Sequence, residues 1–455
     1  MSGGMTPTQN MSAGEFPMGE LSINEDELLE TLLECISIDS VKSEPEEGNP
    51  FGAGVAEALE YLLEKGRQMG FETKNIDGYA GYIEYGSGDE MIGILGHVDV
   101  VPAGDGWESD PFRGVVRDGK VYGRGALDDK GPVIAALYAL KAIKDAGIRV
   151  DRRIRLIIGT DEESGSKDIA RYKQTEEIPV YAFTPDAFFP VINSEKGMVV
   201  FKIGKKLTPT SQFALKEAEG GLVVNQVPAH ASLKLERNGE PVELHSTEGL
   251  AAHGSTPELG INAIDSLFEA AAQAQDFAEY PQGLKDFIEF YRNYFSGDTR
   301  GAALGADYRD ETLGDATFNV GVLTGDENHI EISVDYRHPA NLDNGPYLKR
   351  IEELCRREGM EFELIKQKQG LYFPPEHKLV QVLGEVYRAE TGQAAKPVSM
   401  GGGTYAKSLP NTVAFGPIFP GHEDTMHQAN EYISAADLMA NARIYGKAML
   451  QLAKI

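Results

Sequence analysis

The chain has 455 residues, 41% of them hydrophobic, so it can bury substantial cores and is expected to form two or three domains. Its formal net charge of −28 disfavours nucleic acid and anionic membranes as partners and suits a small cationic or zwitterionic substrate. With two cysteines, Cys35 and Cys355, and no apolar run as long as a membrane span, a disulfide framework is excluded and a cytoplasmic protein is expected.

The first residues differ from the rest of the chain. Residues 1–20 are rich in Gly, Ser and Met without the basic start and apolar centre of a signal peptide, which predicts a flexible tail. Ser22 and Glu25 then have the spacing of a capping box, and leucines recur with helical period over 28–33. An amphipathic helix is therefore expected to open the folded part near residue 21.

Alternating strands and helices predict the α/β class, with a mostly parallel sheet covered by helices. A helical pattern follows Gly131 as far as Gly147, and another runs from His377 to Gly392. Short apolar runs between turn residues predict strands at 91–96, 153–159, 180–183 and 411–416.

Residues 196–373 have a different pattern, which predicts an inserted α+β lid domain. Stretches such as VVFKIGKK, GLVVNQVPAHASLKL, NVGVLTG and HIEISVDYRHP alternate like half-exposed strands, and helical patterns lie near 262–275 and 347–358. Because the strand ending at Gly416 would rejoin the first sheet, the catalytic domain is expected to be discontinuous, formed by 21–195 and 374–455.

Five polar turns carry residues that bind metals. The turns GHVDVVPAGDGW, GRGALDDKGP, GTDEESGS and TPDA each follow an apolar run, and DTMHQANE lies near the end of the chain. Imidazole nitrogens and carboxylate oxygens in this mixture suit zinc or manganese. Open α/β sheets gather their ligands beyond the carboxyl ends of the strands, so these turns are expected to meet. The predicted metal ligands are His97, Asp128, Glu163, Asp186 and His427.

These residues suggest a hydrolase with two divalent ions. A carboxylate that bridges two ions keeps them roughly 3.5–4 Å apart, so that a water between them loses a proton near neutral pH. Asp128 is the predicted bridge, Glu162 the predicted general base, and Asp99 the acceptor for the second imidazole N–H of His97. One ion is expected to bind His97, Asp128 and Asp186, and the other Asp128, Glu163 and His427. Zn²⁺ is the expected metal, with Mn²⁺ or Co²⁺ as alternatives.

Each turn taken alone has an ordinary structural explanation. A histidine and aspartate after a strand can form a surface turn, DEES can be a solvated helix cap, and DD can begin a helix. The occurrence of all of them in this order, after predicted strands, favours the metal site.

The same motifs resemble, in order and spacing, the signatures of M20 metallopeptidases over residues 21–455. SEKG at 194–197, GGGTYAK at 401–407 and FPGHEDTMHQANE at 419–431 look most like the cytoplasmic dipeptidases of the PepV type. The resemblance implies the same ligands and base, and a cis peptide bond between Asp128 and Asp129. Related acylases and carboxypeptidases tend to carry glutamate at the position of Asp186, so aspartate there implies aminopeptidase or dipeptidase activity.

The resemblance also implies residues that contact the substrate. His253 in AAHGSTP matches the histidine that steadies the oxyanion, and Asn225 and Arg337 match positions that hold the C-terminal half of the substrate. The loop of Gly401, Gly402 and Gly403 lies beside the substrate carboxylate in the family. An exposed loop histidine, a rim salt bridge for Arg337 and a plain tight turn remain as structural alternatives. Phe188 departs from the polar or acidic residue of many relatives, and His377 and His422 receive no role.

We therefore expect a dipeptidase that hydrolyses unblocked L-dipeptides and acts as a monomer. Two alternatives stay open at this point: an N-acyl amino acid deacylase of the same family, and a non-catalytic homologue with a binding or regulatory role.

Overall fold

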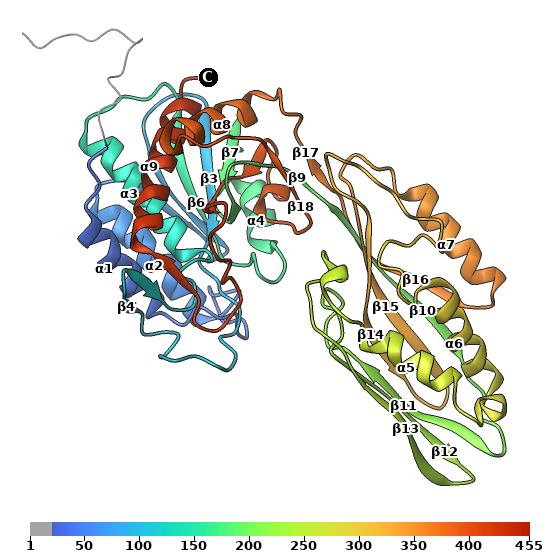
Figure 1. Cartoon of the computed structure of the whole chain (residues 1–455). Coiled ribbons are helices and arrows are strands. Elements are labelled where there is room, and N and C mark those ends of the chain that lie inside the picture. The colour runs from blue at the N-terminus through green and yellow to red at the C-terminus, as the bar shows by residue number, and fades with distance from the viewer. Residues whose placement is uncertain (1–20) are drawn as a thin grey trace, which may run out of the picture. The chain divides into compact units, whose positions relative to one another are not determined.

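The computed structural model describes residues 21–455, which fall into two compact units. The first contains residues 21–172 and 424–455, and the second contains 173–423 (Figure 1). The predicted tail, 1–20, lies outside the described residues. The predicted boundaries of the lid, 196–373, differ from this division and remain an expectation.

The first unit opens with helix α1, as expected, but its cap differs from the prediction. The helix begins at Glu25, and the side chain of Asn24 accepts a hydrogen bond from the backbone N–H of Glu27. Asn24, not Ser22, therefore satisfies a free N–H at the helix start. The buried residues of α1 include Leu28 and Leu32, which are spaced by one turn.

Four strands form the sheet of the first unit, in the order β1-β2-β6-β3. Strands β3 and β6 run parallel, while β1, β2 and β6 pair antiparallel. Almost every residue of β3 and β6 is buried, which accords with their continuous apolar sequences. Helix α3 packs against both strands and against α9 (Figure 1), and α2 packs on β1 and β2. The elements are α1 (Glu25–Ile36), α2 (Ala53–Gln68), β1 (Glu72–Ile76), β2 (Ala80–Tyr85), β3 (Met91–His97), β4 (Val115–Arg117), β5 (Lys120–Tyr122), α3 (Lys130–Asp145), β6 (Arg153–Gly159), α4 (Lys167–Thr175), β21 (Tyr432–Ser434) and α9 (Ala435–Leu452).

The second unit contains a group of short strands around β19. Strand β19 runs parallel to β7 and antiparallel to β9, and β9 also pairs with β17 and β18. The α/β class is confirmed. The pairs β3–β6, β7–β19 and β9–β18 are parallel, whereas β9 pairs antiparallel with β17 and β19. The elements are β7 (Tyr181–Thr184), β8 (Ala187–Phe188), β9 (Ile192–Glu195), β17 (Leu371–Tyr372), α8 (Lys378–Thr391), β18 (Val398–Met400), β19 (Thr412–Ala414) and β20 (Pro417–Ile418).

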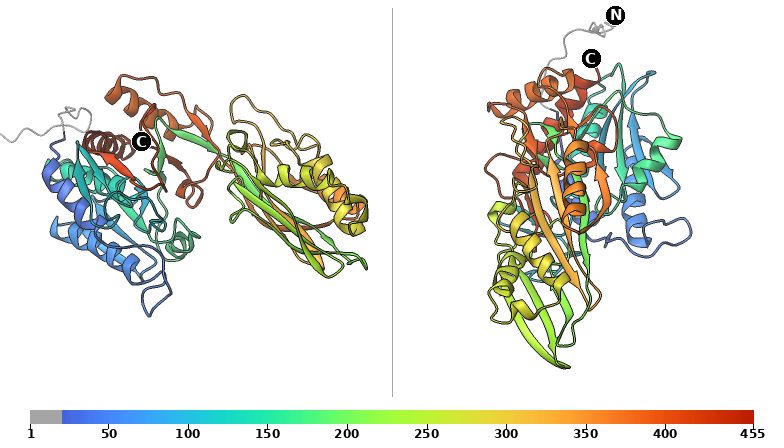
Figure 2. Two further views of the ribbon diagram at one scale, coloured as in Figure 1. Left: turned by 60° about the horizontal axis from the view of Figure 1, so that its bottom comes forward. Right: turned by 90° about the vertical axis from the view of Figure 1, so that its right-hand side faces the viewer.

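The second unit also contains a seven-stranded antiparallel sheet, in the order β13-β12-β11-β14-β15-β10-β16. Helices α5 and α6, drawn in yellow in Figure 2, lie along one face, and their Phe268 and Phe287 join the core under the sheet. The elements are β10 (Gly197–Lys206), β11 (Phe213–Gly220), β12 (His230–Arg237), β13 (Glu240–Glu248), α5 (Ala263–Ala272), α6 (Gln282–Tyr294), β14 (Thr317–Gly325), β15 (His329–His338), α7 (Gly345–Arg357) and β16 (Glu361–Lys368).

One predicted strand of this region is wrong in part. The apolar stretch from 221 to 235 forms a strand only from His230, and residues 221–229 form a loop. Pro228 lacks a backbone N–H, and Asn225 is typical of turns, so neither favours a paired strand. Among the described residues, no helix is long and apolar enough to cross a membrane.

The close approach of β3 to α3 depends on Gly96. A Cβ atom at Gly96 would collide with the side chains of Val133 and Asp129. Gly96→Ala is expected to lower the free energy of unfolding by about 1–3 kcal/mol, because packed cores resist added volume. Gly384→Ala is the control, since its Cβ would meet Ala395 Cβ at 3.5 Å, an ordinary contact, within helix α8. Chemical denaturation of both variants checks this, and equal effects would contradict it.

Candidate metal centre

Asp128 lies between two histidines of the first unit. Its Oδ1 is 3.1 Å from His97 Nε2, and its Oδ2 is 2.9 Å from His427 Nε2. The same His427 nitrogen is 3.1 Å from Glu163 Oε1. His97 and Asp128 are buried, whereas the His427 side chain is 53% exposed. Four of the five predicted ligands therefore meet, although they come from four separate segments.

Only some of these ligands lie where strands end. His97 is the last residue of β3, and Glu163 lies in the turn after β6. Asp128 lies instead directly before α3, and His427 lies in the loop before β21, so the expectation that each ligand follows a sheet strand was wrong for these two. The backbone of His427 adopts a φ of 62°, a conformation uncommon outside glycine that often marks functional positions.

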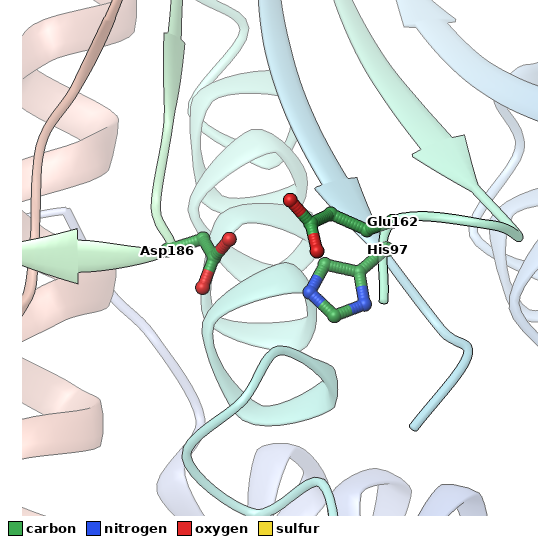
Figure 3. A group of neighbouring side chains, drawn as sticks. All are labelled: His97, Glu162 and Asp186. Atoms are coloured by element: carbon green, nitrogen blue, oxygen red, sulfur yellow. The ribbon is translucent and has the colours of Figure 1, made fainter. Parts of the chain in front are cut away.

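Asp186, the fifth predicted ligand, follows β7 and is half-buried. His97, Glu162 and Asp186 each offer an atom that can bind a metal (Figure 3). Within the first unit, ligand atoms of His97, Asp128 and Glu163 lie within 4.8 Å of one another. Glu162 is thus a candidate ligand as well as the predicted base.

Asp99 contacts both the histidine and the glutamate turn. His97 Nδ1 is 2.9 Å from the backbone carbonyl oxygen of Asp99 and 3.5 Å from its carboxylate Oδ1. The carboxylate accepts hydrogen bonds from the backbone N–H groups of Glu162, at 3.2 Å, and Glu163, at 3.1 Å. The carbonyl is therefore the nearer acceptor for the imidazole, and the Asp99 carboxylate orients the two glutamates.

Two further buried aspartates hold the turn after β6, and the sequence analysis did not single them out. Asp161 accepts hydrogen bonds from Lys42 Nζ and from the backbone N–H of Lys167, and Asp168 accepts from the backbone N–H groups of Thr160 and Asp161. The available signal was the acidic residue on each side of the glutamate pair, Asp161 within DEES and Asp168 after it. Their network fixes the backbone from which Glu162 and Glu163 project.

Burial and the charges of neighbouring side chains shift the pKa values of the residues in this centre. Loss of hydration raises the pKa of Glu162 to about 8, and the neighbouring charges of Glu163 and Asp128 add to this shift. Hydrogen bonds to Asp128 and Glu163 raise the pKa of His427 to about 11. Burial opposes a charge on His97, yet hydrogen bonds to Asp128 and Asp99 raise its pKa well above the usual value.

The donor set fits divalent cations. Burial disfavours the charged form of Asp128, but hydrogen bonds from His427 and His97 lower its pKa overall. The neighbouring carboxylates therefore favour the protonated, positively charged form of both imidazoles. A divalent cation would supply that charge while the imidazoles act as neutral ligands, which is the usual state of histidine at a metal.

A second cluster of predicted residues lies within the second unit. His253 Nδ1 accepts a hydrogen bond from the backbone N–H of Ser255 and lies 2.7 Å from the Ser255 hydroxyl. The backbone N–H of Gly254 donates to the carbonyl of Asn225 at 2.7 Å. A Cβ at Gly401 would lie 2.8 Å from Ser255 Cβ, so the glycine loop approaches the histidine loop as only glycine allows. The two loops and Asn225 are therefore neighbours.

Arg337 is buried in this cluster and is held by other protein groups. Its Nε and Nη2 donate to the carboxylate of Asp335 at 3.0 and 2.9 Å, and its Nη1 donates to the carbonyl of Gly401 at 2.8 Å. The arrangement is a buried salt bridge, not the rim salt bridge considered from the sequence. Glu195, a buried carboxylate that the sequence analysis missed, accepts from the backbone N–H and hydroxyl of Thr404.

The three residues without a clear role lie in structural positions. Phe188 lies in the short strand β8 and pairs with Ile418 of β20. His377 precedes α8 and contacts the rings of Tyr181 and Phe373. The ring of His422 lies 5.7 Å from that of Phe419.

The comparison with protein families settles which group of enzymes this chain resembles. The model of peptidase family M20/M25/M40 matches residues 93–451. The chain belongs to this family. The peptide bond between Asp128 and Asp129 is cis, as the M20 resemblance implies. The expectation of a metal-dependent peptidase is confirmed.

Similar proteins extend the comparison over nearly the whole chain. "Putative dipeptidase YtjP" of Bacillus subtilis is 40% identical, over 96% of this chain and 99% of that protein, and "Putative dipeptidase SH1171" of Staphylococcus haemolyticus is 37% identical over 94% and 97%. The aminoacylhistidine dipeptidase of Vibrio alginolyticus has a similar fold, with a TM-score of 0.60 and 13% identity over 96% of this M20 chain and 98% of that chain.

Metal is expected to stabilise the folded protein. Zn²⁺ or Mn²⁺ added to chelator-treated protein should raise the Tm, since a ligand at a hundred times its Kd adds about 2.7 kcal/mol to the free energy of unfolding. Asp128→Asn should lose most of this gain, whereas Asp26→Asn, at an exposed position of α1, should keep it. Thermal unfolding with and without metal checks this. The same gain in both variants, or none in the wild type, would contradict it.

Proposed function

We propose that this chain is a two-metal dipeptidase that hydrolyses the peptide bond of unblocked L-dipeptides. The observation that carries the proposal is the position of Asp128, whose two carboxylate oxygens face two different histidines, His97 at 3.1 Å and His427 at 2.9 Å. A carboxylate with one oxygen directed to each of two ligand groups suits a bridge between two cations. Glu163 lies beside His427 and is a proposed ligand with it, and Asp186 is proposed as a further ligand of the ion at His97.

Glu162 is the proposed general base. When bound, two divalent cations would lower the pKa of a water and polarise the scissile carbonyl. Burial raises the pKa of Glu162, so its carboxylate would readily take a proton from that water and pass it to the departing amine. Asp99 holds the backbone N–H groups of both Glu162 and Glu163, which keeps the base and a ligand on one rigid turn.

The cluster in the second unit is proposed to bind the substrate. Because a backbone N–H donates to His253 Nδ1, that nitrogen is an acceptor, and the neutral ring carries its proton on Nε2. Such an N–H can stabilise the oxyanion that develops on the scissile carbonyl. Asn225 and the loop of Gly401, Gly402 and Gly403 are proposed to contact the C-terminal residue of the substrate. Arg337 would contribute through the N–H groups that Asp335 and Gly401 do not engage.

Dipeptides are the proposed substrates because the names of two relatives with 40% and 37% identity specify dipeptidases. Aspartate at 186 and the net charge of −28 agree with a substrate that keeps a free amino group. The proposal further includes Zn²⁺ as the native metal, with Mn²⁺ or Co²⁺ as alternatives, a monomeric state and a cytoplasmic location.

Removal of the proposed base should separate hydrolysis from metal binding. Glu162→Gln keeps the shape of the side chain but cannot accept the proton, so kcat is expected to fall by about 10²–10⁴. The variant should still bind two ions per chain, measured by elemental analysis after gel filtration. Near-normal turnover would remove Glu162 from the mechanism, and loss of an ion would make it a ligand instead.

The free amino group of the substrate distinguishes the proposed activity from deacylation. A panel of free L-dipeptides and their N-acetylated forms is to be incubated with protein loaded with Zn²⁺ or Mn²⁺. Hydrolysis of the free forms alone is expected. Preference for the acetylated forms would favour an N-acyl amino acid deacylase, and no hydrolysis of either set would favour a non-catalytic homologue.

A further inference from the structure

Glu431 is a fully buried carboxylate in the first unit that the mechanism above does not use. Its Oε1 accepts hydrogen bonds from the backbone N–H groups of Leu127, at 2.8 Å, and Asp128, at 3.0 Å. Its Oε2 accepts from the backbone N–H of Gly125, at 3.1 Å, and from Arg124 Nη1, at 2.6 Å. One side chain thus engages four donors of the segment that ends at Asp128.

The backbone around Glu431 ties the same segment to the loop of His427. The carbonyl of Glu431 accepts a hydrogen bond from the backbone N–H of Gly123. The next residue, Tyr432, pairs with Tyr122 in the small sheet of β21 and β5, and its backbone N–H donates to the Thr425 hydroxyl. The hydrogen bond between Tyr432 and Thr425 therefore joins the two ends of the loop that carries His427, next to the four donors that bind Glu431.

We propose that Glu431 is a positioning residue that sets the distance between Asp128 and His427 and thereby the affinity of the metal centre. This inference rests on the proposed ligands. The turn before α3 and the loop before β21 each supply one ligand, and the Glu431 carboxylate is the side chain that joins them. A rigid outer arrangement of this kind keeps ligands oriented before the metal binds.

The chemistry of the contact requires a carboxylate. A carboxylate has only acceptor sites and can serve all four donors, whereas an amide of the same shape would direct its NH₂ group at two of them. Burial raises the pKa of Glu431 to about 7, chiefly through lost hydration, and Arg124 and the backbone N–H groups oppose that shift. Glu431→Gln should therefore leave two buried donors without an acceptor and loosen the turn of Asp128.

Glu84 offers a matched control in the same unit. It lies in β2, its side chain is 9% exposed against 0% for Glu431, and its Oε2 accepts from Arg155 Nε at 2.6 Å. Its carboxylate accepts hydrogen bonds from the side chains of Arg153 and Arg155, which lie in β6 and not in a ligand-bearing turn. Glu84→Gln should lower stability without changing the metal centre.

Co²⁺ titration of the full-length, chelator-treated protein tests the proposal, with calorimetry for affinity and visible absorption for ligand geometry. Glu431→Gln is expected to weaken Co²⁺ binding by about 10–100-fold and to change the visible spectrum. Glu84→Gln is expected to keep the affinity and spectrum of the wild type while its Tm falls. A purely structural role for Glu431 would lower the Tm of both variants and leave both cobalt readouts unchanged, which would overturn the proposal.

A conservative variant protects the test against misfolding. Should Glu431→Gln not fold, Glu431→Asp keeps the charge but shortens the side chain by one methylene, and it too should lose Co²⁺ affinity. Wild-type affinity in Glu431→Asp would overturn the proposal. Failure of the wild type itself to bind Co²⁺ would instead refute the proposed metal centre, so the two failures are distinguishable.

Discussion

The negative charge gathered around Asp128 is the constraint on which the rest of the structure depends. Asp99, Asp128, Glu162 and Glu163 lie close together, and two of them, Asp99 and Asp128, are buried. Carboxylates at such a density repel one another unless positive charge is close by. The imidazoles of His97 and His427 supply some of it by holding protons, and divalent cations would supply it more fully. The need for positive charge beside these carboxylates therefore links the stability of the protein to its proposed catalytic mechanism.

The fold holds these acidic residues in place through hydrogen bonds to the backbone of the segments that carry them. Asp99 holds the turn of Glu162 and Glu163, Asp161 and Asp168 brace that turn from behind, and Glu431 holds Asp128. Hydrogen bonds from backbone N–H groups keep the carboxylates in place without neutralising them. In the second unit, glycines serve a comparable purpose, because Gly401 and Gly254 let backbone segments approach closely beside His253.

Much of this could be predicted from the sequence, because the informative residues lie in short motifs next to strongly periodic segments. The strands β3 and β6 follow from their short continuous apolar runs and the helix α3 from its helical period, and His97 and Glu163 follow from their places at and just after strand ends. The role of Glu431 could not be predicted, since its partners lie some 300 positions earlier and no local pattern encodes that contact. The loop at 221–229 was predicted as a strand because the apolar residues in it were given more weight than its turn residues, Asn225 and Pro228.

The most direct test of this account is anomalous X-ray diffraction from crystals of the metal-loaded protein. Two ions roughly 3.5–4 Å apart, both bound to Asp128, are expected from a bridged centre. One ion with His97 and Asp186 on one side, and the other with Glu163 and His427, would complete the result. A single ion, or two ions that do not share Asp128, would contradict the central claim.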